Sequence, residues 1–294
     1  MELAIISGKG GTGKSSIAAA FATLNANVVL ADCDVDAANL YLIFNPTQDE
    51  EEVFTGNYKA VVDNEKCTLC GQCIEYCRFD AISQEKDRII ISETACDGCF
   101  LCSRICPEQA IIMQKNDQSR MYTGKFCNGQ MVYGWLAPGE ENSGKLVNRI
   151  REKIRMLAQE NGTTHIIIDG PPGTGCPVIS AITGTDKLLI VTEPSISGLS
   201  DLKRAVELVQ GFKYPAMVLI NKYDLNPEMT SQIEDFCDSV RIPVIGKLAF
   251  DPQITEAMLN CKSIVEWKPE SAISEELNKI WRNILKDKYH EHRN

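Results

Sequence analysis

The sequence predicts an α/β protein, with a doubly wound, mostly parallel sheet interrupted by a small α+β domain. Three observations lead to this prediction. Short apolar runs alternate with helical segments through most of the 294 residues, which is typical of a parallel sheet covered by helices on both faces. A glycine-rich loop directly follows the first apolar run. Two cysteine runs of identical spacing lie between the first strands and the rest of the chain.

Composition limits the class of protein. The chain is 44% hydrophobic and 24% charged and contains no low-complexity tract, as expected for a soluble globular protein. The net charge of −10 argues against nucleic acid as the main partner. The first residues lack a basic leader, so we expect a cytoplasmic protein whose thirteen cysteines stay reduced.

We expect no membrane partner. No apolar run approaches the roughly 18 residues that a membrane span needs. Near the C-terminus, one helical face carries a stripe of apolar side chains, with nearly balanced charge around it. This pattern favours a helix that packs on the core over one that lies on a membrane. The stripe consists of Leu277, Ile280, Trp281, Ile284 and Leu285.

A phosphate-binding loop is predicted at the N-terminus. The strand Leu3–Ser7 leads into a glycine-rich octet that begins at Gly8, and a helix follows around Ile17–Leu24. This arrangement matches the P-loop, G-x-x-x-x-G-K-[ST], whose backbone N–H groups point at phosphate oxygens. The motif assigns Lys14 to the β- and γ-phosphates and Ser15 to Mg²⁺. The predicted ATP-binding residues here are Gly8, Lys9, Gly10, Gly11, Thr12, Gly13, Lys14, Ser15 and Ser16.

A dinucleotide-binding loop is the alternative interpretation. Gly8, Gly10 and Gly13 also fit G-x-G-x-x-G, and Asp32 ends the next strand about 20 residues on. The pair Lys14-Ser15 favours the P-loop, because a dinucleotide loop does not use a lysine and a hydroxyl there.

Lys9 identifies a more specific resemblance. From Lys9 to Ser15 the loop resembles the deviant Walker A motif, K-G-G-x-G-K-[ST], of the MinD/ParA/nitrogenase-iron-protein class of P-loop ATPases. The resemblance implies ATP hydrolysis and an ATP-dependent homodimer in which Lys9 reaches the partner's nucleotide. Its implied catalytic residues are Lys9, Lys14 and Asp34. The plainer interpretation of Lys9 is a solvated loop lysine.

Later strand ends fit the same family. Asp34 follows the strand Val28–Ala31 in the position of switch I. The resemblance implies that its carboxylate binds Mg²⁺ or positions the attacking water. Asp169 ends the apolar run from Ile166 in the position of Walker B, which implies a second Mg²⁺ contact. Asn221 ends the strand Ala216–Asn221 and resembles the residue that contacts adenine. Singly, each also fits an ordinary cap or turn residue.

The last predicted strand is Ile242–Gly246, and the loop with Asp251-Pro252 resembles the segment that closes over the base. All of these positions lie at strand carboxyl ends, where parallel sheets bind their ligands.

Eight of the thirteen cysteines form two copies of Cys-x-x-Cys-x-x-Cys-x-x-x-Cys. This spacing is typical of ferredoxins with two [4Fe–4S] clusters, in which the fourth cysteine of each run ligates the other cluster. Disulfides and zinc are the alternative uses, and both are disfavoured by the exact repeat and the missing secretion signal. The rule assigns one cluster to Cys67, Cys70, Cys73 and Cys106, and the other to Cys77, Cys96, Cys99 and Cys102.

The predicted domains are an ATPase in two parts, 1–58 and 116–294, with a ferredoxin domain inserted at 59–115. This order resembles a prokaryotic subfamily of MinD-superfamily ATPases with an inserted ferredoxin domain, and the resemblance covers essentially the whole chain. One departure is Arg78, which stands where a proline commonly follows the fourth cysteine.

The resemblance suggests three functions. The leading hypothesis is a nucleotide-switched homodimer that couples ATP to electron transfer through two [4Fe–4S] clusters toward an unidentified redox or client protein. The alternative is a positioning or partitioning ATPase of the MinD/ParA type with structural or redox-sensing clusters. Cluster assembly and delivery is a third, less favoured because fully ligated ferredoxin sites retain their clusters.

The five remaining cysteines carry little information. Cys237 and Cys261 lie in helical patterns, so we expect small buried side chains there. Cys33 and Cys176 adjoin the predicted switch segments, where we expect structural side chains, and Cys127 receives no role.

Overall fold

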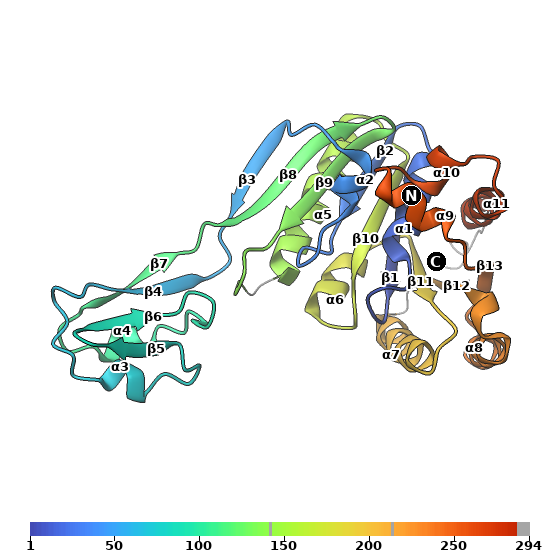
Figure 1. Ribbon diagram of the computed structural model, residues 1–294. Coiled ribbons are helices and arrows are strands. Elements are labelled where there is room, and N and C mark those ends of the chain that lie inside the picture. Colours follow the sequence, from blue (N-terminus) through green and yellow to red (C-terminus); the bar gives the residue numbers. More distant parts are fainter. Residues whose placement is uncertain (141–142, 213–214, 287–294) are drawn as a thin grey trace.

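A nine-stranded sheet forms the main body of the protein in the computed structural model, which describes residues 1–140, 143–212 and 215–286 (Figure 1). The strands are β1 (Glu2–Ser7), β2 (Val28–Asp32), β3 (Glu50–Phe54), β8 (Ser119–Phe126), β9 (Gly129–Trp135), β10 (His165–Pro172), β11 (Lys187–Thr192), β12 (Ala216–Asn221) and β13 (Val244–Leu248). Their order in the sheet is β13-β12-β11-β1-β10-β2-β9-β8-β3. The strands from β13 to β9 pair in parallel, and β8 is antiparallel to both neighbours. The predicted, mostly parallel α/β sheet is therefore confirmed.

Helices cover both faces of this sheet. They are α1 (Lys14–Thr23), α2 (Leu40–Phe44), α5 (Ser143–Glu160), α6 (Cys176–Ile182), α7 (Ile196–Phe212), the 3-10 helix η1 (Tyr223–Leu225), α8 (Pro227–Ser239), α9 (Gln253–Leu259), α10 (Ile264–Trp267) and α11 (Ala272–Lys286). On one face, Ile6 and Ile168 share an apolar core with α5, α6, α7 and α8. On the other, Ile5 and Ile167 pack with α1, α10 and α11. Successive strand residues point to opposite faces, so both must be apolar when both faces are covered.

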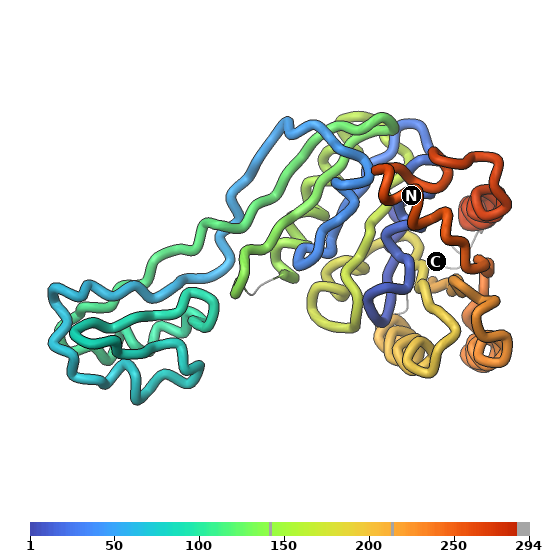
Figure 2. Tube along the Cα trace, viewed as in Figure 1, coloured from blue at the N-terminus to red at the C-terminus, as the bar shows by residue number. Residues whose placement is uncertain are grey.

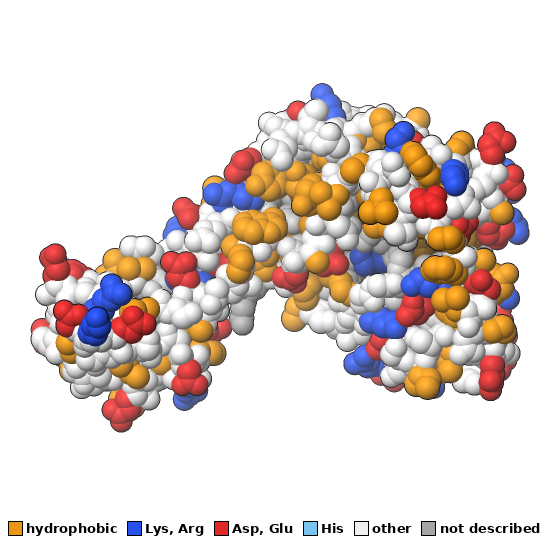
Figure 3. Space-filling view, viewed as in Figure 1, with side chains coloured by type: hydrophobic (Ala, Val, Ile, Leu, Met, Phe, Trp, Pro, Cys, Tyr) orange, Lys and Arg blue, Asp and Glu red, His pale blue; other side chains and the backbone are white. Residues whose placement is uncertain are grey.

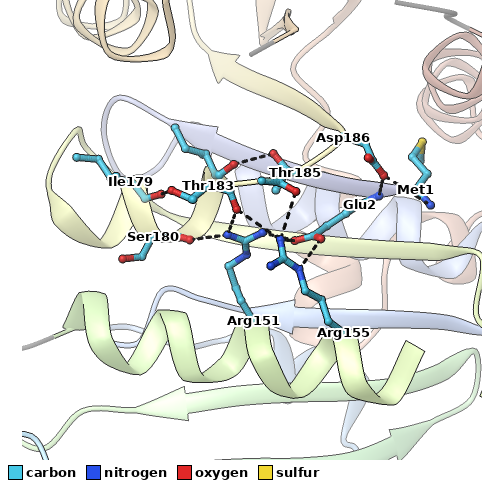
Figure 4. Close-up of polar contacts among 11 residues, drawn as sticks. Met1, Glu2, Arg151, Arg155, Ile179, Ser180, Thr183, Thr185 and Asp186 are labelled. Atoms are coloured by element: carbon cyan, nitrogen blue, oxygen red, sulfur yellow. Dashed lines mark hydrogen bonds and ion pairs between the residues drawn. The ribbon is translucent and has the colours of Figure 1, made fainter. Parts of the chain in front are cut away.

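A buried charge network closes the amino-terminal end of β1 (Figure 4). Arg151 of α5 is only 2% exposed and donates hydrogen bonds to the Glu2 carboxylate and to the backbone carbonyls of Ser180 and Thr183. Arg155 Nε donates to Glu2 Oε2 at 2.9 Å. The network ties β1 to α5 and to the end of α6. It lies at the opposite end of β1 from the glycine-rich loop.

The segment between β3 and β8 forms a separate lobe, called the insert below (Figures 1 and 2). Its elements are β4 (Tyr58–Val62), α3 (Gln72–Glu75), β5 (Ile82–Glu85), β6 (Arg88–Ile91), α4 (Leu101–Ile105) and β7 (Ile111–Lys115). The chain leaves the body through β3 and returns through β8, its antiparallel neighbour. The predicted boundaries at 59 and 115 fall within β4 and at the end of β7, and the domain division stays a prediction.

The insert consists of two similar halves, β4-α3-β5 and β6-α4-β7. Each half pairs its strands with the other half, because β4 pairs with β7 and β5 with β6, both antiparallel. The backbone repeats as well, since left-handed residues recur at equivalent places relative to the cysteines. Their φ angles are 57° and 73° at Leu69 and Gly98, 77° and 67° at Gly71 and Phe100, and 51° and 50° at Asp80 and Gln109.

Several sequence-based expectations need correction. The stretch Met121–Trp135, for which the sequence analysis predicts no strand, belongs to the β8–β9 hairpin. The last strand, β13, begins at Val244 rather than Ile242. Cys237 is buried as expected, whereas the prediction for Cys261 is wrong. That residue is exposed with a φ of 52°, in a turn after α9.

The C-terminal stripe packs on the core through α11, where Leu277, Ile280, Trp281 and Ile284 are buried, but Leu285 is exposed. None of the described helices is long and apolar enough to cross a bilayer. Glu141 and Asn142, and the end of the predicted C-terminal part at 287–294, lie outside the described residues.

Candidate functional site

The glycine-rich loop joins β1 to α1 at the carboxyl edge of the sheet. Gly13 has a φ of 92° and precedes the first turn of α1. A Cβ atom on Gly13 would lie 2.3 Å from Asn221 Nδ2, and one on Gly8 would lie 2.5 Å from Asp201 Cβ in α7. These positions therefore need glycine so that the loop can pack against the end of β12 and against α7.

Lys14 and Asp169 form a buried ion pair below the loop. Lys14 Nζ lies 2.6 Å from Asp169 Oδ1, with the side chains 6% and 0% exposed. Burial alone would lower the pKa of Lys14, but the adjacent Asp169 carboxylate outweighs it and the pKa is raised. Lys14 Nζ also lies 3.4 Å from Ser15 Oγ. The structure thus brings together the three side chains that the motifs assign to phosphate and Mg²⁺.

Two buried polar atoms at this site have no hydrogen-bond partner within the described part of the chain. They are Asp169 Oδ2 and Thr12 Oγ1. Buried polar atoms are nearly always paired, so unpaired ones mark a place where a ligand, ion or water completes the site. A phosphate chain with Mg²⁺ matches them, since Mg²⁺ takes oxygen ligands and a hydroxyl can donate to phosphate. The residues present fit Mg-ATP.

Asp32 has a role that the sequence analysis missed. Its Oδ2 accepts hydrogen bonds from the backbone N–H groups of Asn39 and Leu40, at 2.9 and 3.0 Å, and its Oδ1 accepts one from Asp34 N at 3.1 Å. Complete burial and the neighbouring Asp169 carboxylate raise the pKa of Asp32 to about 7. Asp32 therefore shapes the loop that carries Asp34. Its place at the carboxyl end of β2 was the available signal.

Asp34, the predicted ligand of Mg²⁺ or water, lies at the rim of the same site. Its side chain is only partly buried. Burial is the main reason that the pKa of Asp34 is raised, and the nearby Lys14 ammonium opposes the shift. The geometry leaves this carboxylate near Lys14 and Asp169, and its metal role stays a prediction.

Lys9 folds back onto its own chain. Its Nζ lies 2.7 Å from Glu193 Oε1 and donates to Ser197 Oγ at 2.8 Å. Lys222 approaches the other oxygen of Glu193 at 3.0 Å and donates to Gly11 O at 3.1 Å. Burial would raise the pKa of Glu193, but hydrogen bonds from Lys9 and Lys222 outweigh it and the pKa is lowered. Lysine and arginine side chains gather on this face where β1 meets α7 (Figure 3).

Glu193 was not predicted as a site residue. It directly follows β11 at the same strand edge as Asp169 and Asn221, so its position was a usable signal. Its contact with Lys9 depends on tertiary structure and was not visible in the sequence.

A cavity adjoins the loop on the side of β12. Its lining includes Gly13, Ser16, Asn221 and the segment Phe250-Asp251. Asn221 is 4% exposed, and its Nδ2 donates to Thr12 O at 2.8 Å. The predicted base contact and the predicted base-covering segment therefore share one cavity beside the phosphate loop. This geometry fits a nucleotide base, and the base contact by Asn221 stays a prediction.

The cysteines of the insert surround a second cavity between α3 and α4. Four of the lining residues are the four cysteines assigned to one cluster, and Cys73 of the other set joins them. All thirteen cysteines of the chain are free thiols, so the disulfide alternative has no support. Of the eight cysteines in the two runs, Cys70 and Cys99 are exposed, and the others belong to the small core of the insert or pack against it. The four lining cysteines of one assigned set are Cys77, Cys96, Cys99 and Cys102.

The donor set of this cavity, four cysteine thiols, fits the ligands of an iron–sulfur cluster. Among the described residues, no group of three or more His, Cys, Asp or Glu side chains is arranged to hold one metal ion. A cluster differs because its ligands are spread around four irons. Left-handed residues lie between the cysteines, and alternating right- and left-handed backbone forms the anion-binding concavities of many iron–sulfur sites. Burial and the neighbouring Cys96 raise the pKa of Cys102 to about 11, so metal binding there releases a proton.

Comparisons with known proteins agree with the fold. Residues 3–264 match the CobQ/CobB/MinD/ParA nucleotide binding domain. An uncharacterized protein of Methanocaldococcus jannaschii is 32% identical over 290 residues, covering 97% of this chain and 96% of that protein. The solved structure of the septum site-determining protein MinD with Mg-ADP from Pyrococcus horikoshii superposes with a TM-score of 0.58. The two chains are 19% identical, and the match covers 97% of this chain and 96% of the MinD chain.

A shorter match differs in kind. Over 50 residues the chain is 44% identical to the indolepyruvate oxidoreductase subunit IorA of Methanothermobacter marburgensis, covering 17% of this chain and 8% of that protein. The full-length matches and the site geometry together give the family. The chain belongs to the CobQ/CobB/MinD/ParA nucleotide-binding family and, like MinD and ParA, is an ATPase.

Proposed function

We propose that this ATPase is a nucleotide-driven switch of the MinD/ParA type whose insert carries two [4Fe–4S] clusters. The observation that carries the switch is the buried Lys14–Asp169 pair with one Asp169 oxygen left without a partner. Bound Mg-ATP offers phosphate to Lys14 and a metal to Asp169, and so replaces an ion pair inside the protein by contacts to the ligand. The neighbouring loop that Asp32 holds, with Asp34, responds to that exchange.

The clusters are supported by the insert itself. The two cysteine runs lie on repeated backbone, and the cysteines of one assigned set line one cavity. The assigned ligands are Cys67, Cys70, Cys73 and Cys106 for one cluster and Cys77, Cys96, Cys99 and Cys102 for the other. When bound, the clusters supply one-electron redox centres.

The family favours one use of this switch over the other. Electron transfer was the leading hypothesis from the sequence, but the full-length likeness to MinD supports a positioning or partitioning ATPase better. In that role the clusters are structural or redox-sensing elements. The partner is then a client protein that the nucleotide state of a homodimer recruits or releases.

Electron transfer remains the second candidate because of two observations on the insert. Tyr76 and Phe79 line the cysteine cavity and are 55% and 44% exposed, which gives a redox partner an apolar contact surface beside a cluster. The short match to an oxidoreductase subunit is also about as long as the insert.

Anaerobic purification with iron quantification and EPR spectroscopy, with and without Mg-ATP, tests the proposal. We expect about eight irons per chain, the content of two four-iron clusters. Absence of iron in anaerobically prepared protein would refute the cluster proposal. If ATP alters neither cluster potential nor electron-transfer rate, the coupling of ATP to electron transfer is refuted.

The homodimer is tested through Lys9. To act in trans, Lys9 must leave Glu193 and reach the nucleotide bound by the partner subunit. We expect Lys9→Ala to abolish ATP-dependent dimerisation in size-exclusion chromatography while the iron content stays unchanged. Lys125→Ala, on β8 away from the loop, is the matched control. Dimers that persist in Lys9→Ala would overturn the role assigned to Lys9.

A further inference from the structure

A buried lysine is one of the residues through which the insert contacts the body. Lys59 of β4 is 7% exposed, and its Nζ donates to Cys96 O at 2.7 Å and to Gly139 O at 2.6 Å. Cys96 belongs to the second cysteine run, and Gly139 belongs to the body. Within the described residues both acceptors are backbone carbonyls, and no carboxylate forms an ion pair with this ammonium. Burying a cation without a counter-charge is strongly unfavourable.

A cluster would supply the missing counter-charge. Four thiolates give a [4Fe–4S] cluster a net negative charge, and Cys96 lines the same cavity as the other three cysteines assigned to its cluster. The ammonium of Lys59 holds the backbone of that ligand directly. An anion on the far side of Cys96 would therefore offset the charge of Lys59, which forms no ion pair among the described residues.

The body residue that Lys59 contacts lies in a short segment, 136–140, called the bridging loop below. Gly139 has a φ of 71°, and a Cβ there would lie 2.7 Å from both Thr94 Cα and Thr94 O, so the loop packs tightly against the backbone just before Cys96. Asn116 adds a hydrogen bond from its Nδ2 to Glu140 Oε1. The bridging loop thus contacts the insert at several adjacent points.

The other end of the bridging loop contacts the nucleotide site. Leu136 N donates to Val35 O at 3.0 Å, and Val35 directly follows Asp34. Val35 is buried and shares a core with Leu136. A continuous set of contacts therefore runs from the Asp34 segment through Leu136 and Gly139 to Lys59 and Cys96.

We propose that Lys59 is a positioning residue that sets the electrostatics of the cluster held by Cys96 and links that cluster to the nucleotide site through the bridging loop. The inference rests on the proposed function, because it needs a cluster at Cys96. A change at Asp34 and Val35 on nucleotide binding moves Leu136 and Gly139, and Lys59 passes it to the Cys96 backbone. The other cluster has no such contact within the described residues.

Lys59→Met tests the charge, because methionine keeps an apolar stem and lacks the ammonium. In an EPR-monitored redox titration, we expect one of two cluster potentials to fall, since a nearby positive charge favours the reduced, more negative cluster. The other potential stays unchanged, and Mg-ATP no longer alters the EPR signal of the affected cluster. Lys59→Arg should restore both properties. Lys66→Met removes an exposed lysine of the same insert and is the matched control.

A second measurement does not depend on the redox properties of the cluster. In iron-loaded wild type, hydrogen exchange of the segment 92–97 should respond to Mg-ATP. In Lys59→Met that response should disappear and exchange there should rise about tenfold, as for the loss of one buried charge-assisted hydrogen bond. Gly139→Ala disturbs the same contact from the body side and should also abolish the response.

The outcomes separate the two proposals. Wild type without iron refutes the clusters and, with them, the electrostatic role of Lys59. If wild type is loaded, and Lys59→Met retains both potentials and the response to Mg-ATP, the inference about Lys59 is wrong and the proposed function stands. If Lys59→Met takes up no iron, the iron-loaded Gly139→Ala variant is measured instead, and an unchanged response of 92–97 to Mg-ATP in that variant overturns the link.

Discussion

The main body and the insert are stabilised by different means. The body buries whole strands between two layers of helices, and each face of its sheet has its own apolar core. The insert has a core of seven buried residues, two of which, Cys73 and Cys96, are cysteines. Below roughly 70 residues a single apolar core rarely supplies more than about 3–5 kcal/mol. The body can therefore fold from its own side chains, whereas we expect the insert to depend on the clusters proposed for its cysteines.

The largest expected effect is the unfolding of the insert while the body stays folded. Cys73→Ser removes a buried thiol that is a predicted cluster ligand. We expect lower iron content and loss of nearly all hydrogen-exchange protection over 58–115, because a small metal-dependent domain unfolds without its metal. Protection of β1 and β10, and ATP binding, should be unchanged.

Cys127→Ser is the control for that variant, because Cys127 is exposed and lies in the turn between β8 and β9. It should change neither iron content nor protection. If the insert of Cys73→Ser stays as protected as that of wild type, the contrast between the two regions is wrong.

The next largest effect is a destabilisation of the body that leaves the insert unchanged. Arg151→Met leaves the Glu2 carboxylate buried with weaker pairing and two carbonyls without their donor. Removing one partner of a buried ion pair typically costs about 3–5 kcal/mol. We expect a fall of that size in the free energy of unfolding of the body, measured by urea denaturation, while iron content stays constant.

Arg149→Met is the matched control on the same helix. Arg149 is 59% exposed and pairs with Glu152 at the surface. Such pairs contribute less than about 1 kcal/mol. Equal effects of the two variants would show that the network in Figure 4 does not stabilise the body.

Equivalent methyl deletions in both regions sharpen the comparison. Ile168→Val in β10 and Ile89→Val in β6 remove one methyl from side chains that are 0% and 2% exposed. Each should lower the free energy of unfolding of its own region by about 0.5–1.5 kcal/mol. Ile168→Val should lower the unfolding free energy of the body, and Ile89→Val should raise hydrogen exchange only in the insert. A body destabilised by Ile89→Val would mean that the two regions unfold as one unit.

The difference between local motifs and long-range contacts explains how much of the fold and of the candidate site could be predicted from the sequence. Lys14, Ser15 and Asp169 are found from the sequence because each has a fixed place at a strand end, and parallel strands bring those ends together. The cysteine runs are local patterns with fixed spacing. In contrast, the contacts of Glu193 and Lys59 connect residues far apart in the chain, and no local pattern encodes them. The contacts of Asp32 with Asn39 and Leu40 are local but follow no recognised motif. The β8–β9 hairpin was missed although Asn128-Gly129 is a recognised hairpin signal.

The smallest expected effect concerns the contact that holds Lys9. The pKa of Glu193 lies below its ordinary value of 4.5, so Glu193 stabilises the folded body above that pH and this contribution disappears as the pH falls through the lowered pKa. Glu193→Gln should therefore cost less than about 1 kcal/mol at pH 7, because the pair is partly solvated, and nothing in strong acid. Urea denaturation at both pH values measures this.

Glu193→Gln should slightly destabilise the folded body, but it should favour the ATP-dependent homodimer. With the carboxylate gone, Lys9 loses its ion pair and only the Ser195 and Ser197 hydroxyls continue to hold it. We expect dimerisation at a lower ATP concentration than in wild type, followed by light scattering, with the iron content unchanged. Glu207→Gln, a carboxylate on α7 without an ion pair among the described residues, is the control. Unaltered ATP dependence would mean that Glu193 does not hold Lys9 back, and that the switch in the body begins at Lys14 and Asp169 alone.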